Sequence, residues 1–205
     1  MGLTQEINPE NLSERERVYW DIGGQHIRSV GAYYTDLIIG DTKEKHGLWR
    51  FYDRRGTLTD EQHFFRDRIH GKQRTYHANK NLATESYFVF NVADSIYKEW
   101  GAEGQILVQG EYDMGSPDGE WFYFYNDGQL KSRNNISNDT VYLIDHYLND
   151  SAHTHVVELG SGVIKSFYIS GGLKENYTYS EGLKTGPFEE RMANGIISVM
   201  GQFQY

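Results

Sequence analysis

The chain has 205 residues, no cysteine and a formal net charge of −9. The absence of cysteine excludes disulfides and thiolate metal sites, and no apolar stretch is long enough to cross a bilayer as a helix. The net acidity disfavours nucleic acid and anionic lipid headgroups as partners and favours a basic partner.

The first 21 residues precede the repeated part of the chain and form an N-terminal lead. Asn8 is a suitable helix cap and Pro9 suits the first helical position, so about two turns of helix are predicted through Arg17. The rest of the lead is expected to be irregular. Beyond it, 22 glycines and the absence of a 3.6-residue period argue against helix.

A 24-residue repeat organises residues 22–205. The clearest echo joins Gly47, Tyr52, Leu58, Glu61 and Phe64 to Gly71, Tyr76, Leu82, Glu85 and Phe88. A degenerate copy begins near Gly24, and further copies begin at Gly119, Gly162 and Gly186. The copy at Ser95 has lost its first glycine, and the unit near 143–161 is shortened and degenerate. A fixed period in this range predicts stacked supersecondary units.

Each unit is predicted to be a β-hairpin. Residues 49–52 are rich in strand-favouring aromatics, and glycine-containing turns follow at 53–56 and 126–128. Alternation places Trp49 and Phe51 on one face of the sheet. The predicted fold class is therefore all-β, an elongated, twisted antiparallel meander of about seven hairpins. The recurring aromatics are expected in its core: Trp49, Tyr52, Tyr76, Trp100, Trp121, Phe124, Phe167 and Phe188.

Charge is unevenly distributed along the repeats. Residues 46–80 carry eight lysines and arginines against four acids, whereas residues 81–130 carry nine acids and Lys98 alone. An acidic segment of this kind is either a solvated face that keeps the protein soluble or a surface for a basic partner.

The unit Gly-x-Trp-x-x-Tyr-x-x-x-Gly-x-Leu-x-x-Glu-x-x-Phe resembles the MORN repeat, and is closest to its bacterial variant. The resemblance covers residues 22–205. It implies an elongated, curved antiparallel sheet used for protein–protein contact. Bacterial members often resemble antitoxin or immunity proteins that neutralise a toxin encoded beside them. Other members are associated with membranes or phosphoinositides, or serve as oligomerisation modules.

The resulting expectation is a non-catalytic immunity or antitoxin protein that occludes a cognate toxin with a basic surface. Partner contacts are predicted at Glu99, Glu103, Glu111, Asp113, Asp118, Glu120, Phe122, Tyr123 and Tyr125. No cofactor, metal, nucleic acid or membrane is expected as a partner, and a homodimer is left open. The expected compartment is the cytoplasm, or the periplasm if a leader has been removed.

Two other functions remain as alternatives. A lipid-headgroup-binding or scaffolding protein would use the basic residues Arg50, Arg54, Arg55, Arg66, Arg68, Lys72 and Arg74. A metal-dependent enzyme would use the polar cluster Asp145, His146, Asp150, His153, His155 and Glu158. The spacing of this cluster matches no specific metal motif, and a polar, irregular stretch in which the repeat has decayed also explains it.

Overall fold

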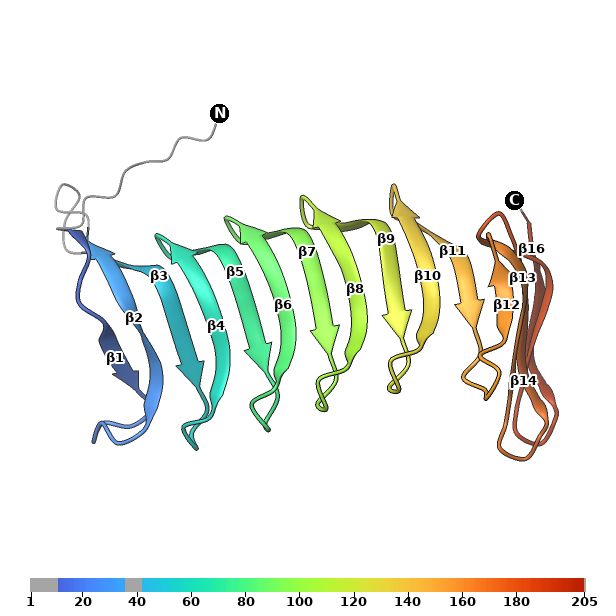
Figure 1. Cartoon of the computed structure of the whole chain (residues 1–205), viewed down its shortest axis with the longest axis horizontal. Coiled ribbons are helices and arrows are strands. Elements are labelled where there is room, and N and C mark those ends of the chain that lie inside the picture. The colour runs from blue at the N-terminus through green and yellow to red at the C-terminus, as the bar shows by residue number, and fades with distance from the viewer. Residues whose placement is uncertain (1–10, 36–41, 205) are drawn as a thin grey trace. The chain divides into compact units, whose positions relative to one another are not determined.

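The computed structural model describes residues 11–35 and 42–204, and within them the chain is all-β. Sixteen antiparallel strands form one open sheet, in which each strand neighbours the next along the sequence (Figure 1). The predicted all-β hairpin meander is therefore confirmed. The described residues contain no helix long and apolar enough to cross a membrane.

The chain divides into two compact units. The first holds residues up to 105 together with 112–115, and the second holds 106–111 together with 116–205. The first contains β1 (Glu16–Tyr19), β2 (Ile27–Thr35), β3 (Lys43–Tyr52), β4 (Leu58–Phe65), β5 (Arg68–Tyr76), β6 (Leu82–Val89) and β7 (Val92–Trp100). Strand β8 (Ile106–Asp113) has residues in both. The second contains β9 (Ser116–Phe124), β10 (Leu130–Ser137), β11 (Thr140–Tyr147), β12 (His155–Glu158), β13 (Ser161–Phe167), β14 (Leu173–Ser180), β15 (Leu183–Arg191) and β16 (Ile197–Phe203).

The helix predicted in the N-terminal lead is absent from the part of it that the structure describes. Residues 1–10, including Asn8 and Pro9, lie outside the described residues. Residues 11–15 are not α-helical, and β1 begins at Glu16. The backbone pairs with β2 instead, because Glu16 lies opposite Gly31 and the Ser13 amide donates to the Tyr33 carbonyl at 2.9 Å. Sheet pairing thus outweighs the local helix signal.

One five-residue turn recurs at the end of most hairpins. In the first example the Asp53 amide donates to the Thr57 carbonyl at 2.9 Å, and the Gly56 amide donates to the Asp53 carbonyl at 3.0 Å. The same two bonds close the turns at 77–81, 101–105, 125–129, 168–172 and 192–196. The glycine turns predicted at 53–56 and 126–128 are therefore confirmed. At 148–154 the turn is longer, and the strand after it, β12, has only four residues.

The first glycine of each repeat unit has a backbone role. Gly47 and Gly119 both have φ of 69°, a conformation that side-chain-bearing residues adopt at a cost. A Cβ atom at Gly47 would meet nothing within 4 Å, so the requirement is conformational rather than steric. Ser95, which replaces this glycine, has the same φ of 69°. The repeat geometry therefore persists where its sequence signature is lost.

In each of the two compact units, one buried tryptophan lies over a glycine of the neighbouring strand. Trp49 is fully buried, donates from Nε1 to the Ala32 carbonyl at 3.0 Å, and lies beside Phe51, as alternation predicts. Its ring lies directly on Gly31, where an added Cβ would come within 2.2 Å of it. In the second unit Trp121 covers Gly110 in the same way, at 2.3 Å. Both glycines are thus needed for close approach.

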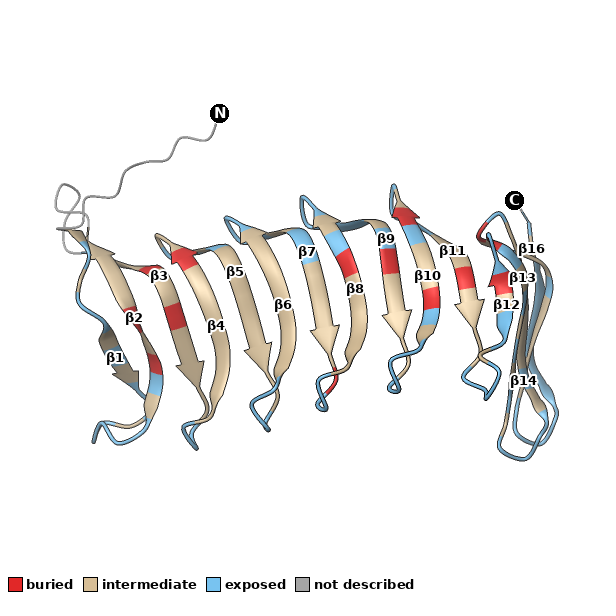
Figure 2. Cartoon of the chain, in the orientation of Figure 1, coloured by how far each residue is buried: buried red, intermediate tan, exposed pale blue. Residues whose placement is uncertain are grey.

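Most of the aromatic residues expected in the core are only half-buried. Of the eight, Trp49 and Trp121 are buried, whereas Phe167 is 59% exposed and the prediction for it is wrong. Figure 2 shows buried residues as isolated positions along the strands. The described strands all belong to a single sheet, so few side chains are covered on all sides.

Candidate protein-binding surface

The face opposite Trp49 in the first unit carries a ladder of alternating charges. Strand register places Arg50, Glu61, Arg74, Glu85 and Lys98 opposite one another in turn. Arg50 Nε lies 2.7 Å from Glu61 Oε1, and Arg74 Nε lies 2.8 Å from Glu85 Oε2. Opposite charges directly across neighbouring strands stabilise a sheet. This ladder therefore satisfies its charges within the unit.

The hydrogen bonds of the ladder lower the pKa values of its two glutamates. Partial burial would raise the pKa of Glu61, but hydrogen bonds from the Tyr76 hydroxyl and Arg50 together lower it below its ordinary value. Glu85 shows the same balance, with hydrogen bonds from Arg74 and Lys72 lowering its pKa. Burial and the bond to Glu61 raise the pKa of Tyr76 to about 12. Both carboxylates are thus held in their charged form.

Three of the residues predicted to contact a partner belong to the first unit. Glu99 is half-buried in β7 and accepts a hydrogen bond from the Tyr97 hydroxyl at 3.1 Å. Burial, together with the Glu99 charge, raises the pKa of Tyr97 to about 12. Glu103 is exposed in the turn at 101–105, and Asp113 is exposed at the far end of β8.

Four of the predicted residues share one face of the second unit. Glu120 and Phe122 alternate with Trp121 along β9, so both lie on the face opposite its ring. Asp118, two residues before Glu120, belongs to that face as well. Glu111 follows Gly110, the glycine beneath Trp121, and therefore also lies on the opposite face. Glu111, Asp118 and Glu120 are exposed, and Phe122 is half-buried. We call these four residues the acidic face.

The two predicted tyrosines lie elsewhere. Tyr123 alternates with Phe122 and therefore lies on the Trp121 side of β9. Tyr125 lies in the turn at 125–129, where its hydroxyl donates to the Tyr147 carbonyl at 2.8 Å. Burial raises the pKa of Tyr125 above its ordinary value. The structure therefore does not gather the three aromatic candidates into one patch.

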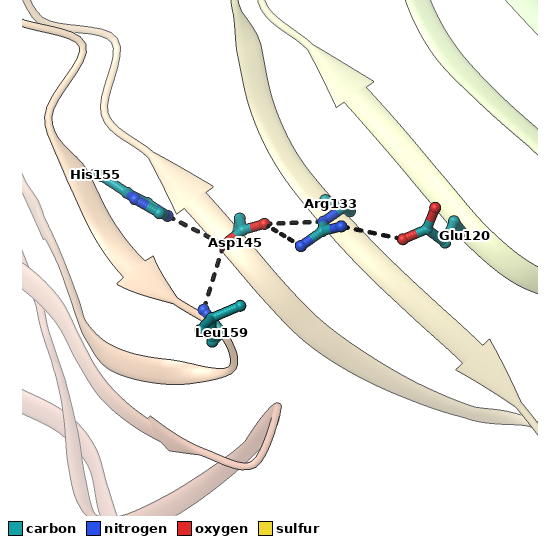
Figure 3. Close-up of polar contacts among 5 residues, drawn as sticks. All are labelled: Glu120, Arg133, Asp145, His155 and Leu159. Carbon is teal, nitrogen blue, oxygen red and sulfur yellow. Dashed lines mark hydrogen bonds and ion pairs between the residues drawn. The ribbon is translucent and has the colours of Figure 1, made fainter.

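A polar network extends from the acidic face across β10 to β12 (Figure 3). Arg133 donates from Nε to Asp145 Oδ2 at 2.8 Å and from Nη1 to Glu120 Oε1 at 3.2 Å. The other oxygen of Asp145, Oδ1, lies 3.2 Å from His155 Nε2 and accepts from the Leu159 amide at 3.3 Å. The Asp145 side chain is 11% exposed, whereas the Glu120 side chain is 56% exposed. Arg133 thus links a buried acid to a surface acid.

The polar cluster at 145–158 is held by packing and hydrogen bonds. The Tyr147 ring stacks on His153 and His155 at centroid distances of 4.6 and 4.2 Å. His153 Nε2 lies 2.6 Å from the Leu130 carbonyl, and Asp150 accepts from the Thr154 hydroxyl at 2.7 Å. Across residues 11–35 and 42–204, no three histidine or acidic side chains are grouped closely enough to hold a metal ion.

Arg133 is the main residue of this site that the sequence alone did not single out. It lies 48 positions after Glu85 and 72 after Glu61, so it occupies an acidic position of the charge ladder with the opposite charge. Asp145 lies opposite it in β11. Comparing charges between equivalent repeat positions would have identified the reversal.

Many of the basic residues considered for lipid binding have acidic partners. Arg50, Arg66, Lys72 and Arg74 each form an ion pair with a glutamate of the first unit. Arg54 lies over the Trp20 ring and Arg68 over the Phe90 ring, while Arg55 is exposed in its turn.

Comparison with solved structures gives two similar chains. The crystal structure of TcdB2-TccC3-Cdc42 is 11% identical, with a TM-score of 0.28, and the match covers 93% of this chain and 12% of that one. Alternansucrase in complex with isomaltononaose is 16% identical, with a TM-score of 0.20, and the match covers 88% and 15%. This chain therefore spans a small part of either protein, and the scores are too low to support a conclusion. No curated protein sequence matches the chain.

The repeats themselves match a known family. Residues 69–89 and 117–138 match the MORN repeat variant. The first segment spans β5 and β6 and the second spans β9 and β10, so each matched segment is one hairpin of the meander. Residues 69–89 and 117–138 are thus MORN-type repeats, one in each unit of a β-hairpin repeat protein.

Proposed function

We propose that this protein is a non-catalytic immunity or antitoxin protein that binds a bacterial toxin through the acidic face of its second unit. The observation that carries the proposal is the clustering of exposed Glu111, Asp118 and Glu120 on one face beside Phe122. No ion pair joins Glu111 or Asp118 to another residue within the described ranges. Their charges are therefore available to a basic partner.

The mechanism would be occlusion of the toxin's active site. Carboxylates on a rigid sheet can occupy a basic cleft in place of an anionic substrate, and complementary charge accelerates association. Phe122 adds apolar area beside these acids, and aromatic side chains are frequent interface anchors. Arg133 donates a hydrogen bond to Glu120, and the Arg133 side chain is itself held by its hydrogen bond to buried Asp145. The acid thereby loses less conformational freedom on binding.

The test is coexpression with the product of the adjacent gene. Wild-type protein should co-purify with that product and relieve its toxicity. A Glu111→Lys/Asp118→Lys variant should weaken binding by at least about tenfold, since each reversal turns attraction into repulsion at the interface. The matched control is Glu158→Lys/Glu181→Lys, which makes the same change in net charge at two exposed sites of the same unit outside the acidic face. It should bind as wild type does.

Two results would contradict the proposal. The adjacent product could be neither toxic nor bound, which removes the immunity function. Alternatively, the two charge-reversed variants could lose equal affinity, which would show that net charge acts rather than the acidic face.

A further inference from the structure

The tip of one hairpin in the second unit folds back onto β11. The Leu143 amide of β11 donates to the Gly182 carbonyl at 2.8 Å, and the Gly182 amide donates to the Gly160 carbonyl at 3.0 Å. Gly182 lies between β14 and β15, and Gly160 lies between β12 and β13. Short β12 pairs with β11 only at His146 and Tyr147. The earlier part of β11 is therefore open to contact with the hairpin tip.

The fold-back depends on glycine at both contact points. A Cβ atom on Gly160 would lie 2.6 Å from the Gly182 backbone nitrogen. One on Gly182 would lie 2.8 Å from the Tyr142 Cβ atom. Both distances are too short for a side chain, so the hairpin tip and β11 are held in close backbone contact.

A cavity of about 320 Å³ lies beside this contact. Val141 and Leu143 of β11 form one apolar wall, and Tyr179 and Leu183 of the β14–β15 hairpin form the other. Val141 is 51% exposed, so solvent reaches this wall. The volume lies at the lower end of the range of small-molecule sites, about 300–1,000 Å³. The cavity therefore suits a small ligand with an apolar body.

The only charged residue that lines the cavity is a lysine. Lys184 is exposed and lies opposite Tyr179 in the neighbouring strand. Its Nζ lies 3.6 Å from the centroid of the Tyr177 ring, and it forms no ion pair within residues 11–35 and 42–204. The positive charge is therefore available to an anion.

Two neutral donors complete the polar lining. Burial raises the pKa of Tyr179, so its hydroxyl keeps its proton at neutral pH and can donate. Asn134 also lines the cavity, and its side-chain amide has no hydrogen-bond partner in the described part of the chain. Donors without partners near a cation favour a ligand that carries acceptor oxygens.

We infer that this cavity binds a small carboxylic acid with an apolar body, such as an aromatic acid. The walls of Val141, Leu143 and Leu183 cover the apolar body. Lys184 pairs with the carboxylate, and Asn134 and Tyr179 supply hydrogen-bond donors. No acidic residue is among those that line the cavity in the described chain, so no like charge opposes the anion.

The cavity is separate from the acidic face. Asn134 lies opposite Trp121 in β9 and opposite Leu143 in β11. Residues directly opposite one another on neighbouring strands share a face of the sheet, so the cavity lies on the Trp121 side. Ligand binding here is thus independent of the proposed toxin binding, and either can fail without the other.

Calorimetric titration of the full chain with phenylacetate tests the ligand class. Phenylacetate should bind at one site, and phenethyl alcohol, which has the same ring but no charge, should bind at least about tenfold more weakly. Lys184→Gln should remove this preference by weakening the binding of phenylacetate alone. Lys165→Gln, at an exposed position of β13 that does not line the cavity, should bind both probes as wild type does.

A cavity-filling variant tests the location. Val141→Trp should abolish binding of both probes, because the added ring occupies the space between the two walls. The matched control is Val163→Trp, at a 40% exposed position of β13, which should bind as wild type does. Circular dichroism should show that both variants keep the wild-type sheet. The absence of saturable phenylacetate binding by wild type, equal affinity for the two probes, or unchanged binding by Val141→Trp would each overturn the inference.

Discussion

The two units place different charges at equivalent positions of one repeat. In the first unit Arg50, Glu61, Arg74 and Glu85 alternate in sign across neighbouring strands and pair with each other. In the second unit, Arg133 occupies the repeat position that Glu61 and Glu85 occupy in the first. It pairs with Asp145 and Glu120. The same scaffold position therefore gives an internally neutralised face in one unit and an acid-rich face in the other. Charge at the repeat positions, rather than the repeat itself, decides what each surface offers to a partner.

The largest expected effect comes from the buried acid of the second unit. Asp145→Asn removes the charge that pairs with Arg133, and we expect about 3 kcal/mol loss in the free energy of unfolding. Glu120→Gln removes the other partner of Arg133, but its side chain is 56% exposed and the loss should stay below about 1 kcal/mol. Urea denaturation measures both. Equal losses would show that burial does not distinguish these two pairs.

A charge reversal tests the ladder of the first unit. Arg74→Glu places three acids in a row across neighbouring strands, and we expect about 1–2 kcal/mol loss in the free energy of unfolding. In the double variant Arg74→Glu/Glu85→Arg, positions 74 and 85 again carry opposite charges. The introduced arginine would lie opposite Lys98, however, so recovery should be partial. If the double variant is less stable than the single one, the ladder is not a pairwise network.

Acid should destabilise the fold in two pH ranges, and the upper one involves both units, because burial and the charge of Arg66 also lower the pKa of His46 in the first unit. Burial, aided by the charge of Lys131, lowers the pKa of His146 below its ordinary value of 6.5, so the unfolded chain takes up this proton first. Stability should therefore fall as pH drops below about 6.5. The lowered pKa values of Glu61 and Glu85 stabilise the fold above about pH 4.5, and this contribution is lost as pH falls further.

Two variants separate these ranges. In urea denaturation between pH 7 and 3, His46→Gln/His146→Gln should flatten the upper part of the profile, and Glu61→Gln/Glu85→Gln the lower part. If either variant flattens the other's range, the assignment of the two transitions to these groups is wrong.

The smallest effects are gains in stability. Ser95 and Lys80 have φ of 69° and 73° at positions where other repeat units have glycine. Ser95→Gly and Lys80→Gly should each raise the free energy of unfolding by about 0.5–1 kcal/mol, because glycine adopts positive φ without strain. The control is Ala83→Gly, inside β6, which should lower stability. A loss at Ser95 would mean that its side chain contributes more than its backbone strain costs.

The repeat made the hairpins, their turns and the alternation of faces predictable from sequence, because glycine and aromatic spacing follow directly from local geometry. Burial was less predictable, as Phe167 shows, since it depends on whether a second layer covers the sheet. The pairing of Arg133 with Asp145 was missed because it depends on strand register in the shortened unit. The acidic candidates were chosen by proximity in sequence, which does not separate the two faces of a strand.

We propose that the acidic face of the second unit binds a basic toxin. The most direct measurement is calorimetric titration of the adjacent gene product with wild type, Glu111→Lys/Asp118→Lys and Glu158→Lys/Glu181→Lys. We expect tight, salt-sensitive binding that only the acidic-face variant loses. Unchanged affinity of that variant, or the absence of binding by wild type, would contradict it.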